Sequence, residues 1–258
     1  GTIAPKEIRV RGFPQNSWDP DDAATERWLL EGEVRDSALI PSSSNYVFLL
    51  ELAIPGIEQE GFAVYKPERG ETPLWDFPPS LYKREIATYL ISEALGWGLI
   101  PPTIEREDGL ENGLGSLQLF IPADMGCTFF DLRDDHTEAM RQFATFDWLT
   151  NNAARKGGHL LQASDGRIWG IDHGLALHSE EKLRTVIWDY AGQPVPNAWL
   201  DQIAALAAQL ENGSATRIQL APYLEEQEID ALHMRATSIL AHPVLPEPPT
   251  WRRPYPWP

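Results

Sequence analysis

The chain has 258 residues, of which 43% are hydrophobic, and a formal net charge of −17. This composition can build a hydrophobic core and excludes an intrinsically disordered protein. The negative charge argues against binding to nucleic acid or to an anionic membrane surface, because both would repel the chain. No apolar run in the sequence is long enough to span a bilayer.

The cysteine content and the first residues indicate the compartment. The single cysteine, Cys127, excludes an internal disulfide framework and a thiolate metal cluster. No charged and apolar leader opens the chain. The first residues, GTIAPKE, lack a methionine, which we interpret as a processed end. We therefore expect a cytoplasmic protein.

The first half of the chain is typical of a β-rich unit. Apolar, aromatic and β-branched runs alternate with turn residues, which predicts strands, and one amphipathic stretch ends at Gly96, as a helix does. The expected elements are an extended arm over residues 1–27, strands within 27–40, 45–53 and 61–67, a helix within 79–97 and a strand over 115–122.

Helices dominate after residue 122. The expected elements are a helix over residues 135–149, a polar loop over 151–159, a strand over 167–171, helices over 197–213 and 225–243, and a proline-rich extended tail over 244–258, packed by its tryptophans or loose. This order predicts an α+β fold with two lobes and a cleft between them. The small N-lobe would cover residues 28–121 and the larger, mostly helical C-lobe residues 122–243.

The polar stretch SSSNY, residues 42–46, lies between two predicted strands. Backbone N–H groups in such a turn can point at an anion, which makes Ser43, Ser44 and Asn45 candidates for phosphate binding. Serine runs also occur in ordinary loops, so the stretch alone does not decide between the two.

Lys66 and Glu85 form a second candidate group. Lys66 ends an apolar strand, where it can lie in the cleft and neutralise phosphate oxygens or extend into solvent. Glu85 lies in the following predicted helix and could hold a buried lysine in place, as in kinase sites generally. Glu85 on the surface, beside Lys83 and Arg84, is the alternative.

Asp172 and His159 are candidates for a metal site. Asp172 follows the predicted strand RIWGI, and a carboxylate there suits Mg²⁺, which prefers oxygen ligands and retains several waters. A turn aspartate is the structural alternative. A zinc site with His173 and His178 is disfavoured, because further ligands with suitable spacing are missing from the sequence.

Two segments together resemble a known superfamily. FDWLTNNAARKGGHLL and the later IDHGLAL resemble the catalytic loop and the metal-binding strand of the phosphatidylinositol 3-/4-kinase-like superfamily, which includes the HipA-type bacterial serine kinases. SSSNYVFLLEL, AVYKPERGETPLWDFP and LYKREIATYLISEALGWGLIPPT look similar to an uncharacterised bacterial branch described as phosphatidylinositol-kinase-like. The resemblance covers residues 28–240 approximately.

The resemblance implies a two-lobed protein-kinase-like fold that binds ATP and Mg²⁺. Lys66 matches the lysine that contacts the ATP phosphates, and Glu85 matches its partner on the helix. Gln118 and Phe120, in QLFIPAD, fall on the hinge that would hold adenine.

The catalytic loop both matches and departs from the superfamily. Arg155 matches the arginine of the Asp-Arg-His motif, and Asp172 matches the aspartate that binds Mg²⁺. Ala154 stands where the catalytic aspartate is expected, Lys156 replaces the histidine, and His159 stands where an asparagine would bind metal. Lys156 and His159 are normal for the bacterial branch, which leaves Ala154 as the unusual residue.

Two explanations of Ala154 stay open: a natural pseudokinase, or an Asp→Ala substitution that blocks turnover, which we favour. The expected function is an ATP-dependent kinase that acts on a protein or small-molecule hydroxyl, inactivated at Ala154. The alternatives are a nucleotide-dependent binding module, an adenylyl transferase on the same fold, and a scaffold protein that binds no nucleotide.

Overall fold

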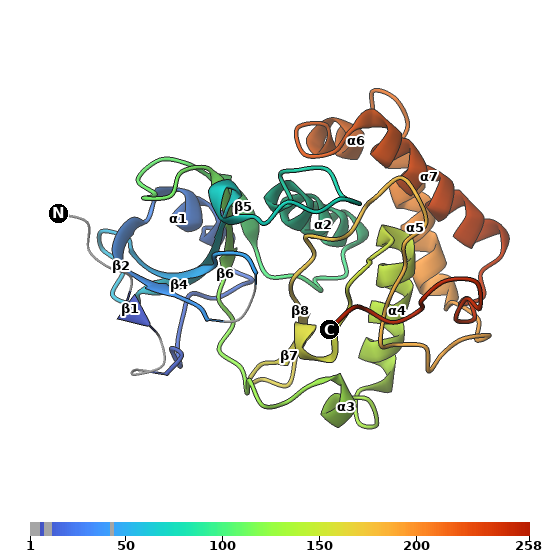
Figure 1. The fold of residues 1–258 in the computed structure, drawn as a ribbon, viewed down its shortest axis with the longest axis horizontal. Coiled ribbons are helices and arrows are strands. Elements are labelled where there is room, and N and C mark those ends of the chain that lie inside the picture. Colours follow the sequence, from blue (N-terminus) through green and yellow to red (C-terminus); the bar gives the residue numbers. More distant parts are fainter. Residues whose placement is uncertain (1–5, 8–11, 42–43) are drawn as a thin grey trace.

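The computed structural model describes residues 6–7, 12–41 and 44–258. A β-rich half and a mostly helical half lie side by side (Figure 1). The strands are β1 (Lys6–Glu7), β2 (Glu33–Leu39), β3 (Phe48–Ala53), β4 (Gly61–Pro67), β5 (Thr103–Arg106), β6 (Gly115–Leu119), β7 (Leu160–Gln162) and β8 (Ile168–Gly170). The helices are α1 (Thr25–Glu31), α2 (Tyr82–Leu95), α3 (Phe129–Leu132), α4 (Thr137–Thr150), α5 (Asn197–Gln209), α6 (Ala215–Leu220) and α7 (Glu226–Ala241).

The described strands form one large sheet and one hairpin. The sheet has the order β1-β2-β3-β4-β6-β5, and the hairpin consists of β7 and β8. Pairing in the sheet is antiparallel except between β1 and β2. Side chains alternate across β4, so Ala63 and Tyr65 are buried in the core while Val64 and Lys66 lie on the opposite face. This alternation directs Lys66 towards the space between the two halves.

Each half contributes an element to the core of the other. Residues of α2, among them Ile91 and Leu95, belong to the core that the C-terminal helices build. In return, Leu161 of β7 and Trp169 of β8 belong to the core beneath the large sheet. Side chains near the cleft are therefore held by both cores, while the exact domain boundary at residue 122 stays a prediction.

The region after the N-terminal arm differs from the expectation. Residues 27–40 were expected to form a strand and turn, whereas the structure has a helix, α1, followed by β2. A helix of seven residues is too short to be stable alone. Packing decides here, because Thr25 and Leu29 are fully buried one helical turn apart.

The helix α2 follows the sequence pattern closely. It ends at Gly96, whose backbone adopts the left-handed conformation with φ +71°, as the glycine stop in the sequence predicts. Its buried face includes Glu85, so a charged side chain lies among apolar neighbours. Such a carboxylate requires a partner.

The tail is extended, but arginine and backbone contacts hold it rather than tryptophan packing. Arg252 donates a hydrogen bond to the carbonyl oxygen of Leu183 at 2.5 Å, and the N–H of Thr185 donates to the carbonyl oxygen of Pro254 at 3.0 Å. Trp251 is 73% exposed and Trp257 61% exposed. The chain end therefore lies beside residues 181–185, near the centre of the molecule in Figure 1.

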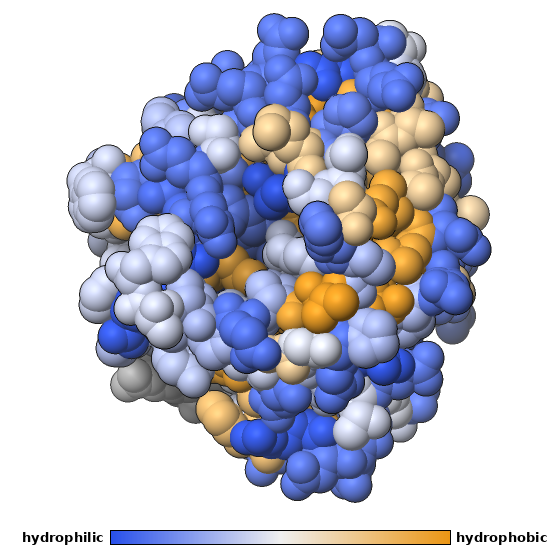
Figure 2. All heavy atoms as spheres, turned by 90° about the vertical axis from the view of Figure 1, so that its right-hand side faces the viewer, coloured by the Kyte–Doolittle hydropathy of each residue, from blue (hydrophilic) through white to orange (hydrophobic). Residues whose placement is uncertain are grey.

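Figure 2 shows the face on the side of α5, α6 and α7. Hydrophilic residues cover most of it, and hydrophobic residues gather around its centre and right-hand side. Exposed large hydrophobic residues of the helices at this end include Ile218 on α6 and Met234 on α7. Among the described residues, no helix combines the length and apolar character needed to cross a membrane.

Candidate functional site

A cleft of about 790 Å³ lies between the sheet and the helical half. Pockets that bind small molecules and cofactors commonly have volumes of about 300–1,000 Å³. Most of the residues predicted from the sequence line it: Ser44, Asn45, Lys66, Glu85, Gln118, Phe120, Ala154, His159 and Asp172. Ser43 lies outside the described residues, and Arg155 is fully buried.

Lys66 is the centre of an ion-pair group that joins the two halves. Its Nζ lies 2.7 Å from Oε1 of Glu85 and 2.5 Å from Oδ1 of Asp172. The other oxygen of Glu85 accepts a hydrogen bond from the backbone N–H of His173 at 2.9 Å. Glu85 on α2 thus fixes both the lysine and the chain that follows Asp172.

The charges of this group stabilise one another. Burial opposes the charged form of Lys66, but Asp172 and Glu85 raise the pKa of the ammonium above its ordinary value. Burial would raise the pKa of Asp172, yet Lys66 and then His159 hold the pKa of this carboxyl well below its usual range. Both groups are therefore charged at neutral pH. The side chain of Asp172 is 42% exposed, so it is accessible from the cleft.

The backbone at Asp172 is in an unusual conformation. Its φ is +62°, in the left-handed region that L residues rarely occupy. Hydrogen bonds on both sides maintain this conformation, from the N–H of Ile171 to the carbonyl of His159 and from the N–H of His173 to Glu85. Conformations of this kind cost about 1–3 kcal/mol and cluster at functional sites.

His159 lies against Asp172 at the wall of the cleft. Its Nε2 is 3.3 Å from Oδ2 of Asp172, and its Nδ1 accepts a hydrogen bond from the backbone N–H of Lys156 at 3.2 Å. Burial lowers the pKa of the imidazole to about 4, although Asp172 acts in the opposite direction. A neutral ring that accepts at Nδ1 carries its proton on Nε2. In this arrangement His159 orients Asp172, and metal ligation at Nε2 would require the proton to move to Nδ1 and the hydrogen bond from Lys156 to break.

Arg155 lies behind the loop instead of facing the cleft. Its guanidinium pairs with the fully buried Asp147 through two contacts, Nε to Oδ2 at 2.9 Å and Nη2 to Oδ1 at 3.0 Å. Nη1 donates to the carbonyls of His159 and Ile171. All of these contacts are made within the protein, so in this geometry Arg155 steadies the loop.

Asp147 supports the loop before His159, a role that the sequence did not reveal. It accepts a further hydrogen bond from Asn152 at 3.1 Å, and the amide oxygen of Asn152 accepts from the N–H of Ala154 at 3.0 Å. A carboxylate inside the apolar run MRQFATFDWLT was the available signal, because a buried charge requires a partner. The network holds Ala154 at the cleft wall.

The remaining predicted residues contribute shape and hydrogen bonds. Gln118 donates its amide to Thr103 at 2.9 Å, and Phe120 stacks on Phe13 with ring centroids 5.7 Å apart. Asn45 accepts a hydrogen bond from the N–H of Thr72 at 2.7 Å. Gln118, Phe120 and Asn45 therefore line the same cleft as Lys66, while their roles in nucleotide binding stay predictions.

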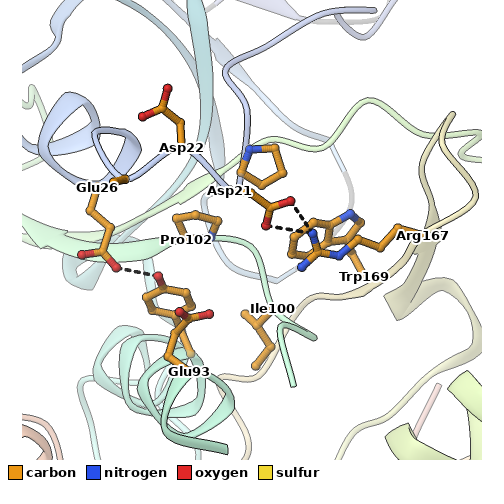
Figure 3. A pocket seen from close by; sticks show the side chains of 11 residues that line it. Asp21, Asp22, Glu26, Glu93, Ile100, Pro102, Arg167 and Trp169 are labelled. Atoms are coloured by element: carbon orange, nitrogen blue, oxygen red, sulfur yellow. Dashed lines mark hydrogen bonds and ion pairs between the residues drawn. The ribbon is translucent and has the colours of Figure 1, made fainter. Parts of the chain in front are cut away.

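A second cavity, of about 280 Å³, lies where the N-terminal arm approaches the hairpin (Figure 3). Arg167 donates to both carboxylate oxygens of Asp21, at 2.9 and 2.8 Å, and its guanidinium lies 3.6 Å from the ring centroid of Trp169. The hydroxyl of Tyr89 pairs with Glu26 across the same space. The contact between Arg167 and Asp21 joins the N-terminal arm to the hairpin, and the contact between Tyr89 and Glu26 joins α2 to α1. The sequence gave no signal for either contact.

Comparison with models of known protein families gives no match. Protein Rv2133c of Mycobacterium tuberculosis is 40% identical over 266 residues, which cover 89% of this chain and 93% of that protein. The chain belongs to the same family as Protein Rv2133c. Phosphatidylinositol 4-kinase gamma 4 of Arabidopsis thaliana is 28% identical over 131 residues, which cover 42% of this chain and 23% of that protein.

Solved structures show the same fold at low sequence identity. The Golgi casein kinase with Mn/ADP bound superposes with a TM-score of 0.53 and 13% identity, covering 84% of this chain and 74% of that one. Hydra Fam20, solved with a sugar, gives a TM-score of 0.51 and 12% identity, covering 89% and 91%. The predicted α+β, protein-kinase-like fold is therefore confirmed.

Proposed function

We propose that the cleft binds ATP with Mg²⁺ and that the parent protein, with an aspartate in place of Ala154, transfers a phosphoryl group to a hydroxyl of a protein or small molecule. One observation carries the proposal: Lys66 is held between Glu85 and Asp172 inside the cleft of a protein-kinase-like fold. Phosphoryl transfer depends mainly on positioning and charge neutralisation, and this group offers both. Among the structures with the same fold, one is a kinase solved with Mn/ADP.

Each charged residue has a separate part in this proposal. Lys66 would exchange its contact with Asp172 for a phosphate oxygen, while Glu85 keeps the ammonium in place. Asp172 would hold Mg²⁺, which neutralises the phosphate charge when bound. The described residues contain no group of three or more His, Cys, Asp or Glu arranged for a metal, and this fits Mg²⁺, which is often bound by one or two carboxylates together with phosphates and water.

We expect Ala154 to affect phosphoryl transfer and not nucleotide binding. A methyl group cannot accept the proton of an acceptor hydroxyl, and general-base assistance is worth about 10²–10⁴ in rate. The residues that would bind ATP and Mg²⁺ do not include Ala154. We therefore expect this chain to bind nucleotide and transfer phosphate very slowly, whether Ala154 is natural or a substitution.

A second candidate is a binding module that responds to nucleotide. It is favoured by the position of Lys66, whose ion pairs link α2 to the chain after β8. A nucleotide that draws Lys66 away from Asp172 would change this link without any chemical reaction.

The more specific assignments, to the HipA-type and bacterial branch of the superfamily and to the cytoplasm, also remain proposals.

The Ala154→Asp variant distinguishes these functions. The variant and the parent chain are incubated with Mg²⁺ and ATP labelled at the γ- or the α-phosphate, with the chain itself and a cell lysate as acceptors. Label transfer from the γ-position by the variant supports a kinase, and transfer from the α-position supports an adenylyl transferase. Normal ATP binding without transfer of either label would overturn the transferase proposal and leave the binding module.

A further inference from the structure

Four cationic side chains gather beside the catalytic loop of this strongly acidic chain. Lys182 and Arg184 come from the segment over residues 181–185, and Arg252 and Arg253 come from the tail that lies on it. The hydrogen bond from Arg252 to the carbonyl of Leu183 brings the two segments together. We call these four residues, three arginines and Lys182, the arginine cluster.

The arginine cluster lies beside the loop that carries Ala154. The backbone N–H of Arg184 donates to the carbonyl of Asn152 at 2.9 Å, and the N–H of Arg155 donates to the carbonyl of Arg184 at 3.1 Å. Arg184 is thus hydrogen-bonded to the loop on both sides of Ala154. A hydroxyl that reaches the position of the missing carboxylate would bring the rest of its molecule close to this segment.

The charges of the cluster are incompletely compensated. Asp76 lies 3.9 Å from Lys182, and Glu181 lies 3.5 Å from Arg252. Burial lowers the pKa of Arg184, and Arg252 and Arg253 lower it further, with partial compensation by Asp76. The hydrogen bond from Arg252 to the carbonyl of Leu183 places its guanidinium beside the residue that precedes Arg184. Like charges at this spacing disfavour one another, and a bound anion would relieve the repulsion.

Two nitrogen atoms of the cluster also lack partners. Within the described residues, the Nε atoms of Arg184 and Arg252 are buried without a hydrogen-bond partner. Buried donors are nearly always satisfied, so each exception indicates an additional acceptor such as a bound water or ion. Arg252 is held rigidly, since its side chain is 11% exposed and already bonded to Leu183.

We propose that the arginine cluster binds an anionic group, a phosphate or a carboxylate, carried by the acceptor molecule. The assignment of the anion to an acceptor molecule rests on the proposed function. Anion binding by the cluster does not depend on it. Guanidinium groups match the planar geometry of carboxylate and phosphate oxygens and form strong charge-assisted hydrogen bonds. The substrate class is then a phosphorylated or acidic molecule with a free hydroxyl, in place of a neutral alcohol.

The test is an NMR titration of the arginine Nε–H signals in the full chain. A non-hydrolysable ATP analogue with Mg²⁺ is added first, so that the main cleft is occupied. Inorganic phosphate is then titrated at constant ionic strength, and acetate in a second sample. We expect saturable shifts of the Arg184 and Arg252 signals. Shifts with phosphate but not with acetate would indicate a phosphate-specific site, and shifts with both anions would indicate a general anion site. Shifts with neither anion would overturn the proposal.

Matched variants guard against a general charge effect. Arg184→Gln removes one donor from the cluster, while Arg27→Gln removes the same charge from an exposed position on α1. We expect the first variant to weaken phosphate binding about tenfold, the usual value of a charge-assisted hydrogen bond, and the second to have no effect. Unchanged binding in Arg184→Gln, with a normal melting temperature, would contradict the proposal. The arginine Nε–H signals report anion binding by the cluster and do not report binding in the cleft. Failure of the ATP analogue to bind would therefore contradict the proposed function and leave the test of the cluster intact.

Discussion

Two ion pairs lie close together in this protein, and they differ in their access to solvent. Arg155 and Asp147 are both 0% exposed, and their hydrogen bonds are directed to the loop that they support. Lys66 and Asp172 are 24% and 42% exposed and face the cleft. A buried pair can only maintain a conformation, whereas a pair at the cleft wall can exchange one partner for a ligand. The comparison separates residues that shape the site from residues that would bind in it.

The largest effect is expected from breaking the buried pair. Arg155→Met leaves the carboxylate of Asp147 uncompensated inside the helical core, and removal of one partner from a buried pair costs about 3–5 kcal/mol. Urea unfolding followed by circular dichroism measures the loss. The double variant Arg155→Met with Asp147→Leu should recover part of it, because no unpaired charge remains. A loss below about 1 kcal/mol in the single variant would contradict the assigned burial.

An intermediate effect is expected from acid. The pKa of His159 is lowered to about 4 in the folded protein, against about 6.5 in an unfolded chain. Between these values the unfolded state binds the additional proton, so the free energy of unfolding decreases as pH falls from about 6.5 towards 4. His159→Asn should reduce this slope, measured by thermal unfolding across that range. His242→Asn, at an exposed position, is the matched control, and equal slopes for the two variants would refute the assignment.

The smallest effect is expected at the contact between the arm and the hairpin. Arg167 and Asp21 have side chains that are 31% and 67% exposed, and exposed ion pairs contribute about 0–1 kcal/mol. Arg167→Gln should therefore lower the free energy of unfolding by about 1 kcal/mol or less. The same unfolding measurement in 1 M salt should reduce the difference from the parent, since salt screens exposed pairs. A loss comparable with that of Arg155→Met would mean that this contact is as important as the buried pair.

The sequence predicted those elements and site residues whose pattern lies within one continuous segment. The ends of two apolar strands located Lys66 and Asp172, and the helical period with Gly96 located α2. Their close approach across the cleft rested on the superfamily resemblance, because Lys66 and Asp172 are far apart in the chain. Their roles in binding stay predictions.

Contacts made by packing alone were beyond the sequence. The helix α1 is short and depends on the burial of Leu29, so local propensity gave the wrong element. The arginine cluster joins residues 182–184 to residues 252–253, and no periodic pattern connects two irregular segments. The tail gave the same difficulty, because its aromatic residues suggested packing while Arg252 and the carbonyl of Pro254 make the contacts.

The most direct test of the central claim is calorimetric titration of Mg·ATP into the parent chain and the Lys66→Met variant. We expect the parent to bind despite Ala154, and the variant to bind about 10–100-fold more weakly, since a hydrogen bond to a charged group is worth about 1.5–3 kcal/mol. Arg27→Gln provides a charge-matched control that should bind like the parent. Absence of binding by the parent, or equal affinity of the Lys66→Met variant, would contradict the assignment of this cleft to ATP.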